Sequence, residues 1–180
     1  LIIIYLILIK ITQSRLIIYG AYTITALLPN YIAYNNVIGT EVFFTFLFSI
    51  ILLLQVYPFK PWIRYPLWGI FIGAAALTKP FFMAYPVVAA FMYWLKTKKL
   101  RQAVISFASL FLIMALVIAP WTYRNYKKFG RFIPISYNSG YVLYINNNHY
   151  NATGAWMDLQ EADAPQHVKD QIAEILSQKD

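Results

Sequence analysis

One stretch decides the fold class: Ala103–Trp121, with the sequence AVISFASLFLIMALVIAPW and no charged residue. As a helix it would rise about 28 Å at ~1.5 Å per residue, close to the ~30 Å hydrocarbon core of a bilayer. The chain is 60% hydrophobic and only 12% charged, whereas soluble domains carry about 25% charged residues. The sequence therefore predicts an all-α polytopic membrane protein.

Further apolar segments precede this stretch, at residues 1–9, 16–28, 42–57, 65–77 and 81–95. We expect a transmembrane domain over residues 1–123, with about six segments that cross the bilayer by tilting or local thinning where they are short. Residues 124–180 are predicted to form an extracytoplasmic loop region. Because Leu1 opens directly into an apolar run, with no basic region before it, the chain is expected to be a fragment.

The charges predict the topology. Up to Tyr123 there are nine Lys and Arg and a single acid, Glu41, whereas six basic and six acidic residues follow from Arg124 onward. Eight of the nine lie in three short polar breaks: Lys10 and Arg15; Lys60 and Arg64; Lys96, Lys98, Lys99 and Arg101. Cytoplasmic loops carry such an excess, so the net charge of +8 indicates orientation in a membrane and not nucleic-acid binding.

The segment between Tyr65 and Leu95 is expected to be two helices. As one helix it would be about 46 Å long at ~1.5 Å per residue, well beyond a ~30 Å core. Pro80 removes a helical hydrogen bond and biases Lys79 away from the helical region, which predicts a break there. Two crossings place all three basic breaks on the cytoplasmic side, and Lys79, Glu41 and the tail on the opposite side.

The tail predicts two further elements. Residues 132–145 contain turn signals at Asn138–Gly140 between two β-prone runs, and we expect them to form a hairpin or an extended loop. Asp163 can cap a helix with Pro165 in its first turn, and apolar residues then recur at helical spacing: Val168, Ile172, Ile175 and Leu176. This predicts an amphipathic helix that lies on the membrane or packs on the loop.

Glu41 and Lys79 are the two isolated charges of the membrane part. An acid at a helix start is stabilised by the macrodipole, but ionisable groups at membrane depth are costly and tend to mark sites. Glu41 can thus simply begin a helix, or orient a hydroxyl or hold a divalent cation. Lys79 can snorkel to the interface, or neutralise a phosphate leaving group beside the broken helix.

Arg124, Asn125 and Tyr126 follow the last apolar segment, with more basic residues behind them. A basic residue can mark the end of a span, but outside the cytoplasm it also suits an anionic ligand, and Arg binds two phosphate oxygens at once. The asparagines at 146–148 and 151 suit a sugar site or an ordinary loop. With no cysteine and only His149 and His167, the sequence contains no zinc knuckle, thiol nucleophile or His-rich metal pattern.

Three stretches in this order resemble the polyprenyl-phosphate-dependent membrane glycosyltransferases of the GT-C superfamily, in the protein-mannosyltransferase-like branch. They are Val37–Phe44 (VIGTEVFF), Gly73–Pro80 (GAAALTKP) and Ala119–Ser136 (APWTYRNYKKFGRFIPIS). The third is the longest and the most specific. The similarity extends over most of residues 30–157.

This resemblance implies an inverting glycosyltransferase that moves a sugar from a polyprenyl-phosphate donor to a hydroxyl on a lipid, glycan or protein, outside the cytoplasm. The protein would be a multi-pass protein of a bacterial or archaeal plasma membrane or of the ER membrane. The family's base, an Asp or acidic pair in the first external loop, is expected upstream of Leu1. Glu41 would be a supporting acid, and Lys79, Arg124, Asn125 and Tyr126 would bind the lipid phosphate. Lys79 stands where many members have Arg.

The alternative is a non-enzymatic flippase or transporter of lipid-linked sugars, in which the same charges line a pathway. An acidic residue in the first external loop of the complete protein favours the enzyme.

Overall fold

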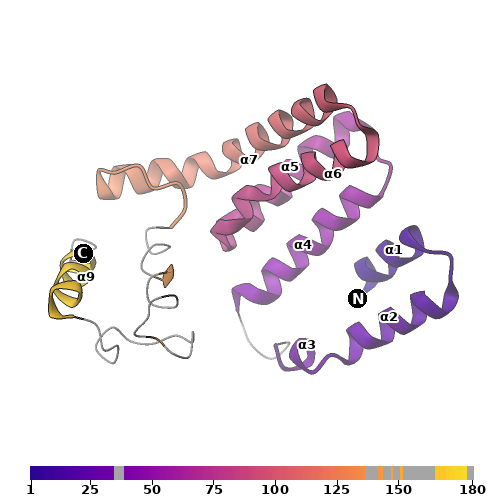
Figure 1. Cartoon of the computed structure of the whole chain (residues 1–180), viewed down its shortest axis with the longest axis horizontal. Coiled ribbons are helices and arrows are strands. Elements are labelled where there is room, and N and C mark those ends of the chain that lie inside the picture. The colour runs from indigo at the N-terminus through magenta and orange to yellow at the C-terminus, as the bar shows by residue number, and fades with distance from the viewer. Residues whose placement is uncertain (35–38, 137–141, 144–146, 148–150, 152–164, 178–180) are drawn as a thin grey trace. The chain divides into compact units, whose positions relative to one another are not determined.

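The computed structural model describes residues 1–34, 39–136, 142–143, 147, 151 and 165–177, which are helical with irregular connections and contain no strand. The helices are α1 (Ile2–Ile11), α2 (Arg15–Leu27), α3 (Pro29–Tyr34), α4 (Thr40–Val56), α5 (Pro61–Thr78), the 3-10 helix η1 (Pro80–Ala84), α6 (Tyr85–Thr97), α7 (Leu100–Phe129) and α9 (Gln166–Ser177) (Figure 1). The all-α part of the predicted fold class is confirmed. Among the described helices, α7 alone is long and apolar enough to meet the criteria for a membrane span.

The chain forms two compact units, Leu1–Pro120 and Trp121–Asp180, called unit 1 and unit 2 below. The division falls inside α7. Each unit is described by itself.

The predicted break before Pro80 is confirmed. α5 ends at Thr78, and Lys79 takes an extended conformation with φ −134° and ψ 99°, as expected for a residue that precedes proline. The amide of Lys79 still donates to the Ala75 carbonyl at 2.9 Å. Pro80 then begins η1, and α6 follows from Tyr85. The charged side chain of Lys79 is therefore held at a corner of the chain.

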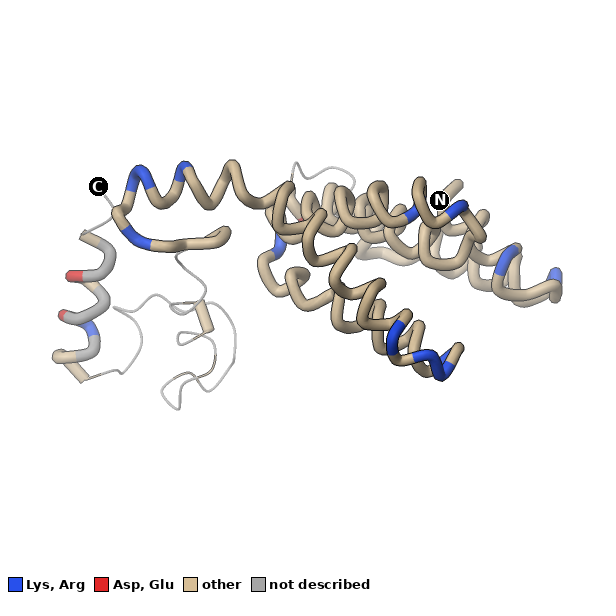
Figure 2. The backbone as a smooth tube through the Cα atoms, turned by 90° about the horizontal axis from the view of Figure 1, so that it is seen from above, with Lys and Arg blue, Asp and Glu red and all other residues tan. Residues whose placement is uncertain are grey.

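In unit 1 the connections alternate between two ends. The α1–α2, α4–α5 and α6–α7 connections lie at one end, whereas the start of α4 and the α5–η1 corner lie at the other (Figure 1). The three basic breaks fall at the first end, where Figure 2 shows most of the blue positions of unit 1. A contact across this end is that of Lys10, whose Nζ lies 5.7 Å from the centre of the Tyr57 ring.

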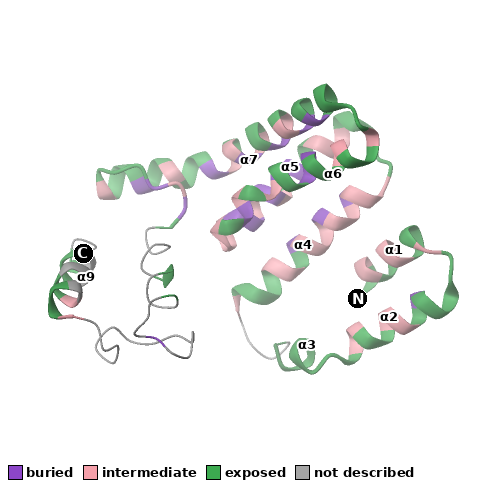
Figure 3. Ribbon diagram, in the orientation of Figure 1, coloured by how far each residue is buried: buried purple, intermediate pink, exposed green. Residues whose placement is uncertain are grey.

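The core of unit 1 runs along α4, α5 and α7, where Figure 3 shows most of the buried positions. The buried residues of α4 are Leu47, Ile51 and Leu54, which share one helical face. α5 meets α7 through glycine. A Cβ on Gly69 would lie 2.6 Å from Ile113 Cβ, and one on Gly73 would lie 2.7 Å from Val117 Cβ. Glycines four residues apart thus let the two backbones approach closely.

Unit 2 corrects one boundary of the sequence analysis. α7 does not end with the predicted apolar segment at Trp121 but continues to Phe129, so Arg124, Asn125 and Tyr126 are helical and not part of a loop. Gly130 ends the helix with φ +62°, and its amide donates to the Tyr126 carbonyl at 2.9 Å. This left-handed glycine is the usual helix terminator, and charge alone does not stop a helix.

The other predictions for the tail have mixed outcomes. The turn of the predicted hairpin, 138–140, lies outside the described residues, and Val142 and Leu143 are helical instead of extended. The C-terminal helix is confirmed as α9, with the Lys169 amide donating to the Pro165 carbonyl at 3.3 Å just before the helix begins. Its predicted cap, Asp163, lies outside the described residues.

Candidate functional site

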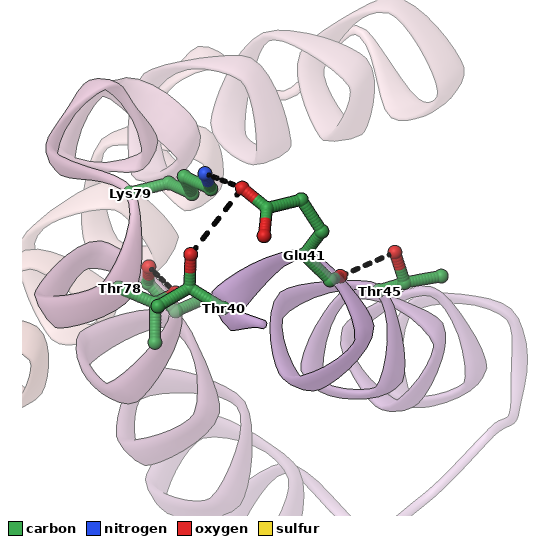
Figure 4. Close-up of polar contacts among 6 residues, drawn as sticks. Thr40, Glu41, Thr45, Thr78 and Lys79 are labelled. Carbon is green, nitrogen blue, oxygen red and sulfur yellow. Dashed lines mark hydrogen bonds and ion pairs between the residues drawn. The ribbon is translucent and has the colours of Figure 1, made fainter. Parts of the chain in front are cut away.

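Glu41 and Lys79, which are 38 residues apart in the sequence, form an ion pair in unit 1. Lys79 Nζ donates to Glu41 Oε1 at 2.7 Å. Figure 4 shows the two side chains pointing toward one another, one from the start of α4 and the other from the corner after α5. The structure therefore unites two residues that the sequence had singled out separately.

Local sequence explains why both charges reach this end. Gly39 is the extended residue before α4, so Glu41 lies in the first helical turn, where the macrodipole favours an acid. Thr40 Oγ1 also lies 3.4 Å from Glu41 Oε1. Lys79 is the residue that ends α5 at the proline break, where its backbone turns extended after the last helical hydrogen bond. Both side chains are partly exposed, with 32% of Lys79 and 49% of Glu41 accessible.

The pairing limits what each charge can do. One of the three ammonium protons of Lys79 is used by Glu41, and the remaining two can bind an anion. The pair as a whole carries no net charge. Lys79 and Thr40 both contact Oε1 of Glu41, so the second carboxylate oxygen, Oε2, is not the one that the ion pair occupies. This oxygen remains an acceptor for a hydroxyl.

A cavity of about 530 Å³ lies beside Glu41, between α1, α2, α3 and α4. Its polar lining includes Glu41, Thr45 and Ser49 of α4, with Thr25 of α2 and Asn30 of α3. α1 contributes the apolar residues Ile3 and Ile4.

The sequence analysis did not predict the polar side of the cavity, although a pattern in the sequence of α4 indicates it. Glu41, Thr45 and Ser49 recur every four residues in a mostly apolar helix, which places them on one face. Thr45 Oγ1 donates to the Glu41 carbonyl and Ser49 Oγ to the Thr45 carbonyl, each at 2.8 Å. Both hydroxyls donate their proton to the backbone, so they present lone pairs to a ligand.

The three predicted phosphate ligands of unit 2 differ in exposure, because two are exposed and one is buried. Arg124 is exposed, and its guanidinium lies 4.6 Å from the centre of the Trp121 ring, with Nη1 3.4 Å from Asn125 Oδ1. Tyr126 is exposed as well. Asn125 is instead 3% exposed, and its Nδ2 lies 3.2 Å from both the Ile133 and Ile135 carbonyls.

Asn125 therefore holds the chain that returns after α7. Two neighbouring side chains hold the same segment, because Trp121 Nε1 donates to the Ile135 carbonyl at 2.9 Å and Thr122 Oγ1 donates to the Pro134 carbonyl at 2.8 Å. The sequence analysis missed this role of the motif. The spacing of the side-chain donors at 121, 122 and 125, which share one helical face, could have predicted this role from the sequence.

Two expectations about the site stay open. The convergence of Lys79 and Arg124 on one phosphate stays a prediction, since the two residues belong to different units. As for a divalent cation, no group of three or more His, Cys, Asp or Glu side chains lies together within the described ranges.

Comparison of the chain with protein-family models, with curated proteins and with solved structures found no match.

Proposed function

We propose that the chain is a polytopic membrane protein, in which α1, α2 and α4–α7 lie in the bilayer. Large apolar side chains support this, because they are widely exposed where a soluble fold would bury them. Examples are Ile2 at 77%, Leu16 at 86% and Phe81 at 70% exposed. The clustering of basic breaks at one end of unit 1 is further support, since it matches the charge bias of cytoplasmic loops.

We further propose that the protein is a glycosyltransferase that uses a polyprenyl-phosphate sugar and acts outside the cytoplasm. The observation that carries this proposal is the ion pair of Glu41 and Lys79 at 2.7 Å. It brings together the charged residues of two of the three sequence stretches that resemble the GT-C glycosyltransferases, at the end of unit 1 opposite the basic breaks.

In the proposed reaction, the oxygen of an acceptor hydroxyl forms a bond to the anomeric carbon while the bond from that carbon to the phosphate oxygen breaks. The hydroxyl proton passes to a general base, which the resemblance to the GT-C glycosyltransferases implies is an Asp or an acidic pair in the first external loop. The bonding electrons leave with the phosphate. Lys79 stabilises the charge that develops on this leaving group with the ammonium protons that Glu41 does not use. Glu41 positions Lys79. Arg124 and Tyr126 stay predicted ligands of a lipid phosphate, whereas Asn125 would act through the chain that it holds.

The test is turnover of the complete protein in nanodiscs with a polyprenyl-phosphate sugar. Lys79→Met should lower kcat, because stabilisation of the departing phosphate is greatest in the transition state. A drop of about tenfold would correspond to about 1.4 kcal/mol of lost stabilisation. Lys79→Arg should hold or raise turnover, since it keeps the charge and adds the two-oxygen fork. Lys96→Met removes a cation from the last turn of α6, at the basic end of unit 1, and is the matched control.

A charge-swapped variant separates chemistry from structure. In Glu41→Lys/Lys79→Glu the pair can re-form, but the cation moves to α4. If the pair only holds α4 to the α5 corner, this double variant regains the turnover that Lys79→Met loses. If Lys79 serves the leaving group, it stays inactive. Lys79→Met with the turnover of Lys96→Met would refute the role of this residue.

A further inference from the structure

We propose that the cavity beside Glu41 binds the uncharged, hydroxyl-rich head group of an amphiphile. The inference deepens the proposed function and rests on it for one point, that the head group is a sugar. The binding chemistry itself follows from the walls of the cavity and the state of the ion pair.

The cavity has the size and the two-sided lining that such a ligand needs. Its volume of about 530 Å³ lies within the range of about 300–1,000 Å³ typical of small-molecule sites. Ile3 and Ile4 on α1 and Phe46 on α4 supply an apolar surface for an alkyl chain. Glu41, Thr45 and Ser49 supply polar atoms from a single face of α4.

The polar face mainly offers acceptors. The hydroxyls of Thr45 and Ser49 donate to backbone carbonyls at 2.8 Å, which leaves their lone pairs for a ligand. Glu41 Oε1 is taken by Lys79, and Figure 4 shows the other carboxylate oxygen turned away from the ammonium. A row of acceptors selects a ligand with several donors, and a polyol is such a ligand.

The ion pair selects against charge in the ligand. Lys79 neutralises Glu41 at 2.7 Å, so a cationic amine gains little unless it displaces Lys79. Glu41, Thr45 and Ser49 line the cavity but Lys79 does not. On this side of the ion pair an anionic head group would therefore meet a carboxylate and the lone pairs of two hydroxyls, and not the free ammonium protons of Lys79. Hydroxyl donors satisfy these acceptors without adding a charge, which makes the neutral sugar the preferred ligand.

Three octyl glycosides with a diazirine in the alkyl chain test this selectivity: a neutral glucoside, an anionic glucuronide and a cationic 2-amino-2-deoxyglucoside. The complete protein in nanodiscs is irradiated with each probe, and labelled peptides are identified by mass spectrometry. We expect the glucoside to label peptides of α1–α4 about tenfold more strongly than either charged probe, the ratio for one decade in affinity. Equal labelling by all three would overturn the inference.

Charge variants should reverse the preference. Lys79→Met leaves Glu41 unpaired and should favour the amine, whereas Glu41→Gln leaves Lys79 unpaired and should favour the glucuronide. The double variant should lose both shifts and favour the glucoside again. Unchanged selectivity in both single variants, with unfolding temperatures like that of the parent, would show that the pair does not face the ligand.

A matched pair of serines tests the location. Ser49 and Ser109 each donate to the carbonyl four residues earlier at 2.8 Å, but of the two only Ser49 lines the cavity. Ser49→Val should reduce labelling by the glucoside, and Ser109→Val should not. Equal effects of the two would place the ligand elsewhere.

The design also separates this inference from the proposed function, because labelling needs no turnover. Selective labelling without glycosyl transfer would keep the site and reject the transferase. Turnover without selective labelling would keep the transferase and reject the site. Competition by a monoacylglycerol as strong as that by unlabelled octyl glucoside would keep the polyol site but assign it to a glyceride head group.

Discussion

At the scale of single residues, Asn125 shows how one polar side chain organises an irregular segment. The chain at 133–135 has neither a helical nor a sheet ladder, so its buried carbonyls need other donors. Asn125 Nδ2 serves two of them at 3.2 Å, and Trp121 and Thr122 add one donor each. Ile133 and Ile135 are thereby held in buried positions, at 7% and 8% exposure.

Asn125→Ala is expected to loosen this segment. It leaves the Ile133 carbonyl without its side-chain donor in a buried place, at a cost of about 1–3 kcal/mol for an unsatisfied buried group. The Ile135 carbonyl loses one of its two donors and keeps Trp121 Nε1. Trypsin cleavage after Arg131 should become faster. Asn147→Ala is the control, since its Nδ2 donates to the Leu143 carbonyl at 3.0 Å in an exposed position. Cleavage of Asn125→Ala at the rate of Asn147→Ala would contradict the scaffold role.

At the scale of elements, the glycines of α5 determine how closely α7 approaches. Gly69 and Gly73 face the β-branched Ile113 and Val117, whose Cβ atoms would lie within 3 Å of an added Cβ. A β-branched side chain cannot withdraw its Cβ, so the helix itself would have to move. If the helices lie in a bilayer as proposed, close packing of this kind would hold α5 and α7 together, because lipid tails supply no hydrophobic driving force between helices.

Gly73→Ala should therefore lower the unfolding temperature of the protein in nanodiscs. Overpacking of this kind costs about 1–3 kcal/mol, more than the gain in helix propensity of ~1 kcal/mol. Gly20 on α2 is the matched control, because a Cβ there would meet nothing within 4 Å. Gly20→Ala should leave the unfolding temperature unchanged or raise it. A similar rise for Gly73→Ala would mean that α5 and α7 do not pack this closely.

At the scale of the whole molecule, the charges of unit 1 are divided between its two ends. The basic breaks lie at the end with the α1–α2, α4–α5 and α6–α7 connections, and the ion pair lies at the other. In a bilayer, this division would place the breaks in the cytoplasm and the pair outside it.

Cysteine accessibility tests this orientation cleanly, because the chain contains no cysteine of its own. Single cysteines at positions 60, 98 and 79 are exposed to a membrane-impermeant maleimide in intact cells. We expect labelling at 79 and none at 60 and 98 until the cells are made permeable. Labelling of 98 but not of 60 in intact cells would mean that residues 65–95 cross the membrane once.

The sequence by itself determined the local features of this protein. Apolar runs fixed most helices, and proline fixed the break at Lys79, because backbone preference and hydrophobicity act over a few residues. The sequence analysis did not predict the start of α3 or the end of α7, although local residues determine both. Pro29 begins α3, since proline suits the first helical position, and Gly130, not the charge at Arg124, ends α7.

Only the tertiary structure decided which distant residues meet. The pairing of Glu41 with Lys79 depends on how α4 and the α5 corner are packed, and the rotation of each helix about its axis is set by its neighbours. The same holds for the cavity beside Thr45 and Ser49, and for Gly73 against Val117. Local sequence places a charge at a helix end, but packing between elements selects its partner.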